Sequence, residues 1–173
     1  MTGATVRILA VLATASLFTT ACAGADEGGG QPSEAKPRAD VEAAIRTEVQ
    51  ALADLARGTV TNWQVKTSRC DIANPGRSWA LSGTARIPLS PDSQVATVGA
   101  IRDRWHRDGW QFGESRVAPD VSLPDTVTGS LLAGHPSAHF NVSVTSRSAQ
   151  DHLAVGFGSG CYQPARGEDP ANG

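Results

Sequence analysis

The sequence predicts an α+β domain in which two helices pack on one face of an antiparallel sheet of about five to six strands, closed by one disulfide. Two segments repeat apolar residues at helical spacing, and several short segments alternate apolar with polar residues. Two of the three cysteines, Cys70 and Cys161, lie among these segments. The predicted order is helix, two strands, helix, then three or four strands, which is typical of an α+β protein.

The first helix is predicted over 41–57. Asp40 can cap its start, and Gly58 is expected at the C′ position that ends it. Its apolar residues form one stripe: Val41, Ala44, Ile45, Val49, Leu52 and Leu55. A one-sided stripe mostly packs on its own domain, so we expect a core helix rather than a membrane or partner surface.

The second helix is predicted from Ser90, a capping residue, to Gly109, with Pro91 at the first helical position. Its expected inner stripe is Val95, Val98, Ile101 and Trp105. The charged run 102–108 offers the i,i+4 pairs Asp103–Arg107 and Arg104–Asp108. We interpret this run as a solvated, self-paired face; a basic surface for anionic envelope lipid or polymer is the alternative.

Six segments are expected as strands: 60–70, 79–87, 110–117, 126–132, 140–145 and 153–161. Alternation is clearest in the last two, with Phe140, Val142 and Val144, and then Leu153, Val155 and Phe157, at every second position. The tripeptide Asn74-Pro75-Gly76 predicts a turn between the first two strands.

The overall composition excludes two classes. The 173 residues include 15 Lys or Arg against 17 Asp or Glu, so there is no basic excess to hold nucleic acid. With 18% charged and 40% hydrophobic residues, the chain is neither a disordered polyampholyte nor a multispan membrane protein.

The N-terminal segment 1–21 is predicted to be a lipoprotein signal peptide. Arg7 precedes an apolar run that ends at Ala21, and 14 helical residues span only about 21 Å, too short to cross a membrane. Thr20-Ala21-Cys22 resembles a bacterial lipobox, although Thr19 stands where Leu is usual. The resemblance implies a multiply acylated, palmitate-bearing Cys22 on the outer face of the cell membrane. An ordinary secretory signal is the alternative.

The remaining chain divides into a tether, a domain and a tail. Residues 22–37 are Gly/Pro-rich and predict a flexible tether after Cys22, 38–162 form the domain, and 163–173 are expected to be a disordered tail. Removing Arg7 with the signal leaves 14 basic against 17 acidic residues, a net charge of −3.

Cys70 and Cys161 are expected to form a structural disulfide, because the chain carries an export signal. The bond would close a loop of 92 residues and stabilise the domain by at most about 4–5 kcal/mol. Catalytic or metal-binding thiols are the alternatives, but there is no CxxC motif. Cys161 shares its strand parity with Phe157, whereas Cys70 has the parity opposite to Trp63, so a bulge or local bend must intervene if Cys70 also faces inward.

No catalytic set or metal site emerges from the motifs. The run 156–161 places Ser159 directly between glycines and is not GxSxG. His135 and His139 have the spacing of helical zinc ligands, but Pro136 argues against a helix there. We therefore predict no catalytic residues, metal or cofactor, and the ligand-binding residues remain unknown.

The motifs over 70–162 resemble the small envelope lipoproteins of actinobacteria, including the LppA-like family. Besides the lipobox, the matching features are Cys70 before Pro75-Gly76, the run 79–83 (WALSG), Gly109-Trp110 after a helix, and Ser159-Gly160-Cys161. The resemblance implies an anchored α+β domain with a disulfide, and it supplies no catalytic residues.

The sequence is compatible with three functions. The leading expectation is a non-catalytic binding or envelope-support module of the cell envelope, anchored through Cys22, with an envelope protein or lipid as partner and no nucleic acid. A carrier of lipid or a small hydrophobe is the alternative, and it would need an apolar cavity between helix 41–57 and the sheet. A hydrolytic enzyme is less favoured and would need a cleft gathering His135, His139 and an acid.

Overall fold

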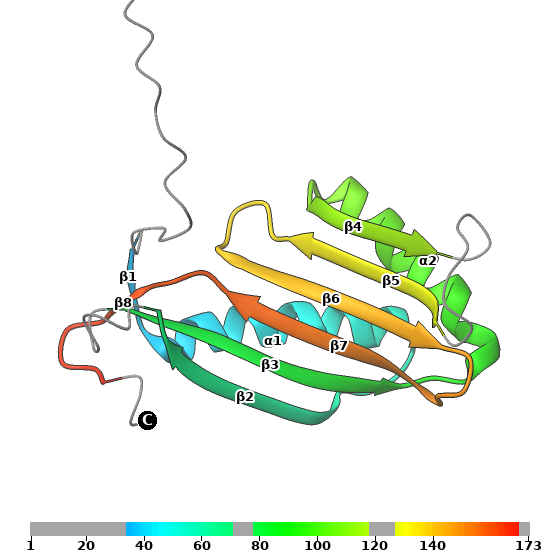
Figure 1. Cartoon of the computed structure of the whole chain (residues 1–173), viewed down its shortest axis with the longest axis horizontal. Helices are drawn as coiled ribbons and strands as arrows, with labels where there is room; N and C mark the ends of the chain where they lie inside the picture. The colour runs from blue at the N-terminus through cyan, green and yellow to red at the C-terminus, as the bar shows by residue number, and fades with distance from the viewer. Residues whose placement is uncertain (1–33, 71–77, 118–126, 170–173) are drawn as a thin grey trace, which may run out of the picture.

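A computed structural model describes residues 34–70, 78–117 and 127–169, in which two helices cover one face of a six-stranded antiparallel sheet (Figure 1). The predicted fold class is therefore confirmed. The sheet order is β2-β3-β7-β6-β5-β4. The elements are α1 (Arg38–Leu55), β2 (Thr61–Arg69), β3 (Trp79–Pro88), α2 (Pro91–Arg107), β4 (Gln111–Val117), β5 (Val127–Gly134), β6 (Phe140–Arg147) and β7 (His152–Ser159).

Several predicted features lie outside the described residues: the signal segment 1–21, Cys22, most of the tether and the turn at Asn74-Pro75-Gly76. Within the described part of the chain, no helix is long and apolar enough to cross a membrane.

The core lies between the helices and one face of the sheet. Alternate residues of β7, Leu153, Val155 and Phe157, are buried on this face, as their spacing predicts. The Phe157 ring stacks on Trp63 with centroids 4.6 Å apart and lies across Gly83, where an added Cβ would meet the ring. Gly83 is therefore required for this close packing.

One carboxylate joins the two helices. Glu48 of α1 accepts hydrogen bonds from both terminal nitrogens of Arg104, at 2.9 Å each, and from Trp105 Nε1, also at 2.9 Å. Arg104 also forms the predicted pair with Asp108, at 3.2 Å, whereas Asp103 contacts Arg102 rather than Arg107. The charged run of α2 is thus partly an inter-helix contact and not wholly a solvated face.

The ends of α1 differ from the sequence-based expectation. The helix starts at Arg38, so Asp40 lies in its first turn and is not the cap; the Arg38 N–H donates to Glu168 Oε1 at 3.0 Å instead. At the other end Arg57, with φ of 52°, takes the left-handed position expected for Gly58. The second helix keeps its predicted signals, with Ser90 at the N-cap and Gly109 at φ of 78° after the end.

The C-terminal segment is part of the fold up to Asp169 and differs from the expected disordered tail. Strand β8 (Gln163–Pro164) pairs in parallel with β1 (Ala35–Lys36), which lies in the expected tether. These two short strands therefore lie side by side at one end of the large sheet (Figure 1).

The disulfide Cys70–Cys161 is formed, with Cα atoms 6.0 Å apart, and confirms the predicted bond. Ser82 pairs with Gly158, and Trp79 pairs with Tyr162. Between these two pairs β3 advances by three residues and the facing segment by four, so the facing segment contains one extra residue. The extra residue lies beside Cys161 and reverses its parity, whereas the β2–β3 register is unshifted from Gln64 to Arg69. The irregularity is therefore on the Cys161 side and not beside Cys70, where the sequence predicts it.

Tyr162 gives the domain a pH dependence that can be measured directly, because it is the only tyrosine of the chain. Burial against Trp79 raises the pKa of the Tyr162 phenol above its ordinary value of 10.0, although Lys36 acts in the opposite direction. The folded state thus favours the neutral phenol. This stabilisation is complete below about pH 10 and is lost as the pH rises through the folded pKa.

We therefore expect the phenolate absorbance of the folded protein to titrate at a higher pH than that of the urea-unfolded chain. The free energy of unfolding should fall above about pH 10, and Tyr162→Phe should remove that part of the fall. Equal titration midpoints in the folded and unfolded protein would contradict the assignment.

Candidate functional site

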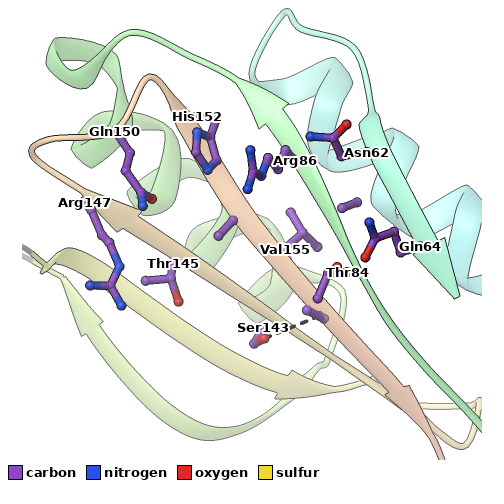
Figure 2. A pocket seen from close by; sticks show the side chains of 13 residues that line it. Asn62, Gln64, Thr84, Arg86, Ser143, Thr145, Arg147, Gln150, His152 and Val155 are labelled. Carbon is purple, nitrogen blue, oxygen red and sulfur yellow. Dashed lines mark hydrogen bonds between the residues drawn. The ribbon is translucent and has the colours of Figure 1, made fainter. Parts of the chain in front are cut away.

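The face of the sheet without helices carries a groove of about 410 Å³ (Figure 2). Its polar lining comes from four adjacent strands and the β6–β7 hairpin: Asn62, Gln64, Thr84, Arg86, Ser143, Thr145, Arg147, Gln150 and His152. A pocket of this volume is large enough for a small organic ligand.

The groove exists because β7, which lies between β3 and β6, carries small residues on this face at Ala154 and Gly156. Gly156 pairs with Thr84 on one side and with Ser143 on the other. In the next row Ala154 lies between Arg86 and Thr145. Neighbouring strands are about 4.8 Å apart, so the two walls stand about 10 Å from each other across a floor of glycine and alanine.

The charge of the described lining is positive. Arg86 and Arg147 lie on opposite sides of β7, and Asp and Glu are missing from the described residues that line the groove (Figure 2). Asp151 lies next to the rim, where His152 Nδ1 is 3.1 Å from its Oδ1. The hydrogen bond from His152 is the largest cause that lowers the pKa of Asp151, and the charge of Arg86 contributes. The Asp151 side chain is 94% exposed, so water screens its charge.

Asn62, at the rim of the groove, lies in a bulge of β2. The β2–β3 register shifts between Thr61 and Gln64, and Asn62 has a φ of 48°. Asn tolerates this left-handed conformation better than most residues. Asn62 and Gln64 both line the same side of the groove.

The hairpin end of the groove is fixed by Gln94, which is fully buried on α2. Its Nε2 donates to Gln150 O at 2.6 Å and to Leu89 O at 3.2 Å, and its Oε1 accepts from the Arg147 N–H at 3.1 Å. A single side-chain amide thereby holds the backbone of two groove residues, Arg147 and Gln150.

Sequence reasoning missed Gln94 because it assigned the inner stripe of the helix to apolar residues, starting at Val95. The buried positions are Gln94, Val98, Ile101 and Trp105, while Val95 is half-buried. The spacing of these four positions was a usable signal, since a Gln in phase with a buried stripe predicts a buried, hydrogen-bonded amide.

One acceptor beside the groove lacks a donor. Gln150 Oε1 is buried and has no hydrogen-bond partner among the described residues, although Gln150 lines the groove. A buried acceptor without a donor costs stability unless something supplies the donor.

The residues singled out from the sequence lie elsewhere. His135 Nδ1 accepts from the N–H groups of Ser137 and Ala138, and its ring packs on Trp110 and Phe140. The ring of His139 faces Tyr162 instead, so the two imidazoles do not converge. In the described ranges no group of three or more His, Cys, Asp or Glu side chains could hold a metal ion.

Ser159 is engaged by the backbone. Its Oγ donates to Gly160 O and accepts from the Leu81 N–H, both at 2.8 Å. The contact with Leu81 fastens the end of β7 to β3, which agrees with the interpretation of 156–161 as a terminal strand.

Comparisons with protein-family models, with curated proteins and with solved structures found no match to this chain.

The role of Gln94 can be tested by replacing it with methionine, which keeps the volume and removes the hydrogen bonds. Gln94→Met would leave the Arg147 N–H and the carbonyl of Gln150 without their partner. The free energy of unfolding should fall by about 2–3 kcal/mol, measured by urea denaturation. Amide exchange at 147–151 should become faster.

Gln50→Met is the matched control, because the Gln50 amide contacts Asp54 on the exposed side of α1. We expect a change within about 0.5 kcal/mol there. Equal effects of the two substitutions would show that Gln94 does not hold the hairpin.

Proposed function

We propose that this protein is an exported, lipid-anchored module of the cell envelope that binds a ligand in the polar groove without catalysing a reaction on it. The groove carries the proposal, because it gathers nine polar side chains on a sheet face that the helices leave open. Nothing in the packing of the core requires these side chains, so their gathering on one concave surface favours binding over structure.

The anchor is proposed from the sequence alone. The short apolar run before Thr20-Ala21-Cys22 supports export and lipidation of Cys22, as does the resemblance to LppA-like lipoproteins. Several acyl chains on one residue would hold the domain stably at a membrane, whereas a single chain would not.

The position of the groove suits this anchor. The chain coming from Cys22 enters the fold at β1, beside β8 and the Trp79↔Tyr162 bridge. Arg86 lies seven residues further along β3, about 23 Å from Trp79. The charged end of the groove is therefore far from the point where the tether joins the domain (Figure 1).

The carrier alternative loses support from the packing between α1 and the sheet. Ile45, Val49 and Leu52 of α1 are each 0% exposed, as are Ile87 and Leu153 on the facing strands. Side chains without any exposed surface leave no water-sized void beside them, so this space is filled. A hydrolytic site at His135 and His139 is not supported either, because their rings face different neighbours.

Lipid anchoring is tested by Cys22→Ser in the native host. The variant should leave the membrane fraction, because it lacks the acylated thiol, while the wild-type protein should show the mass of an acylated cysteine. Retention of the variant in the membrane, together with an unmodified Cys22 in the wild type, would contradict the anchor.

Ligand binding is tested by placing a photo-crosslinking amino acid at Thr145, in the wall of the groove, in the full chain in intact envelope. Mass spectrometry should identify an envelope component attached at this position. The control position is Thr47, which is exposed on α1. Capture from both positions alike, or from neither, would argue against the groove as a binding site.

A further inference from the structure

We propose that the ligand of the groove is an anionic polyhydroxyl chain, a chain of hydroxyl-bearing units with phosphate or carboxylate groups, whose negative groups Arg86 and Arg147 bind. This inference deepens the proposed function and rests on the groove being the binding site.

The two guanidinium groups supply the preference for an anion. Neither Arg86 nor Arg147 forms a side-chain hydrogen bond or ion pair with a described residue. Arg104, by contrast, is satisfied by two carboxylates, Glu48 and Asp108. A guanidinium with open donors binds phosphate or carboxylate through two parallel hydrogen bonds.

The separation of the two arginines favours a ligand with more than one negative group. They come from β3 and β6, the strands on either side of β7 (Figure 2). A groove of about 410 Å³ is also far larger than one inorganic anion needs. A chain with repeated charges can reach both guanidinium groups, whereas a single anion cannot fill the space between them.

The other lining side chains favour hydroxyl groups on the ligand. Thr84 and Thr145 offer short hydroxyls that both donate and accept, and Asn62 and Gln64 add amides. The Ser143 hydroxyl donates to Gly156 O at 3.4 Å, so it offers the ligand an acceptor.

The scarcity of aromatic side chains in the lining narrows the class of ligand further. Phe, Trp and Tyr do not occur among the described lining residues, and the imidazole of His152 is the single aromatic ring there, so ring stacking contributes little to the affinity. Charge and hydrogen bonds must carry it, which disfavours neutral glycans and apolar molecules. Binding should therefore weaken as salt screens the guanidinium groups.

The test measures binding to the full chain, extracted in a non-ionic detergent, by calorimetry. The probes are a short poly(glycerol phosphate), an oligogalacturonate and a neutral dextran oligomer of similar length. We expect binding of one or both anionic probes, weakening with added sodium chloride, and none of dextran. The two anionic probes distinguish a phosphate-bearing chain from a carboxylate-bearing one.

The variant for this test is Arg86→Gln with Arg147→Gln, which should weaken binding of the anionic probe at least tenfold. The matched control is Arg57→Gln with Arg107→Gln, which removes the same charge from exposed helix ends and should change affinity less than twofold. Unchanged urea midpoints would show that both double variants stay folded.

Three results would overturn the inference: no binding of either anionic probe, equal binding of dextran, or equal weakening by the control variant. If the anionic probes fail while Thr145 still captures an envelope component, the ligand class is wrong and the proposed function stands. If Thr145 also captures nothing, both the proposed function and this inference fail.

Discussion

The core and the groove both depend on the alternation along β7. Leu153, Val155 and Phe157 fill the space beneath the helices, and the residues between them, Ala154 and Gly156, leave the opposite face almost without side chains. A shift of one residue in the pairing of β7 would exchange the two faces. It would place small residues in the core and fill the groove with large apolar ones, so the burial that fixes the register also fixes the floor of the groove.

The helices shape the groove although they lie on the other face of the sheet. Gln94 reaches from α2 to the backbone of the β6–β7 hairpin, and Glu48 of α1 binds Arg104 and Trp105 further along α2. The position of α2 is thus set at both ends by buried polar contacts. Because a buried amide or carboxylate is costly without its partners, these contacts specify one arrangement of the hairpin that carries Arg147.

Local patterns were sufficient to predict most of the fold. The alternation at 140–144 and 153–157 identifies strands β6 and β7, and Ser90, Pro91 and Gly109 bracket α2 because helix ends are set by local backbone chemistry.

The parts that were missed depend on contacts between distant residues. The pairing of β1 with β8 joins two-residue segments that have no periodicity of their own. The irregularity beside Cys161 follows from the β3 register, which parity within one strand cannot show.

The groove could not be predicted for the same reason. Thr84 and Arg86 alternate with the buried residues of β3, and Ser143 and Thr145 alternate with those of β6, so each polar face follows the period of its own strand. The order β3-β7-β6 alone brings these two faces together across Gly156 and Ala154. That order is set by long-range packing. The pattern within each strand therefore predicts its polar face, but it does not predict which polar faces lie next to each other.

The pairing of β1 with β8 places the attachment point of the proposed tether away from the binding surface. If Cys22 carries lipid, as we propose, tension on the tether reaches the fold at Ala35–Lys36, which β8 holds in parallel pairing. Next to β8, the Trp79↔Tyr162 bridge and the Cys70–Cys161 disulfide tie this end of the chain into the sheet. The charged end of the groove lies at the other end of β3 and β7, held by Gln94. Movement of the domain on its tether therefore need not disturb the geometry of Arg86 and Arg147.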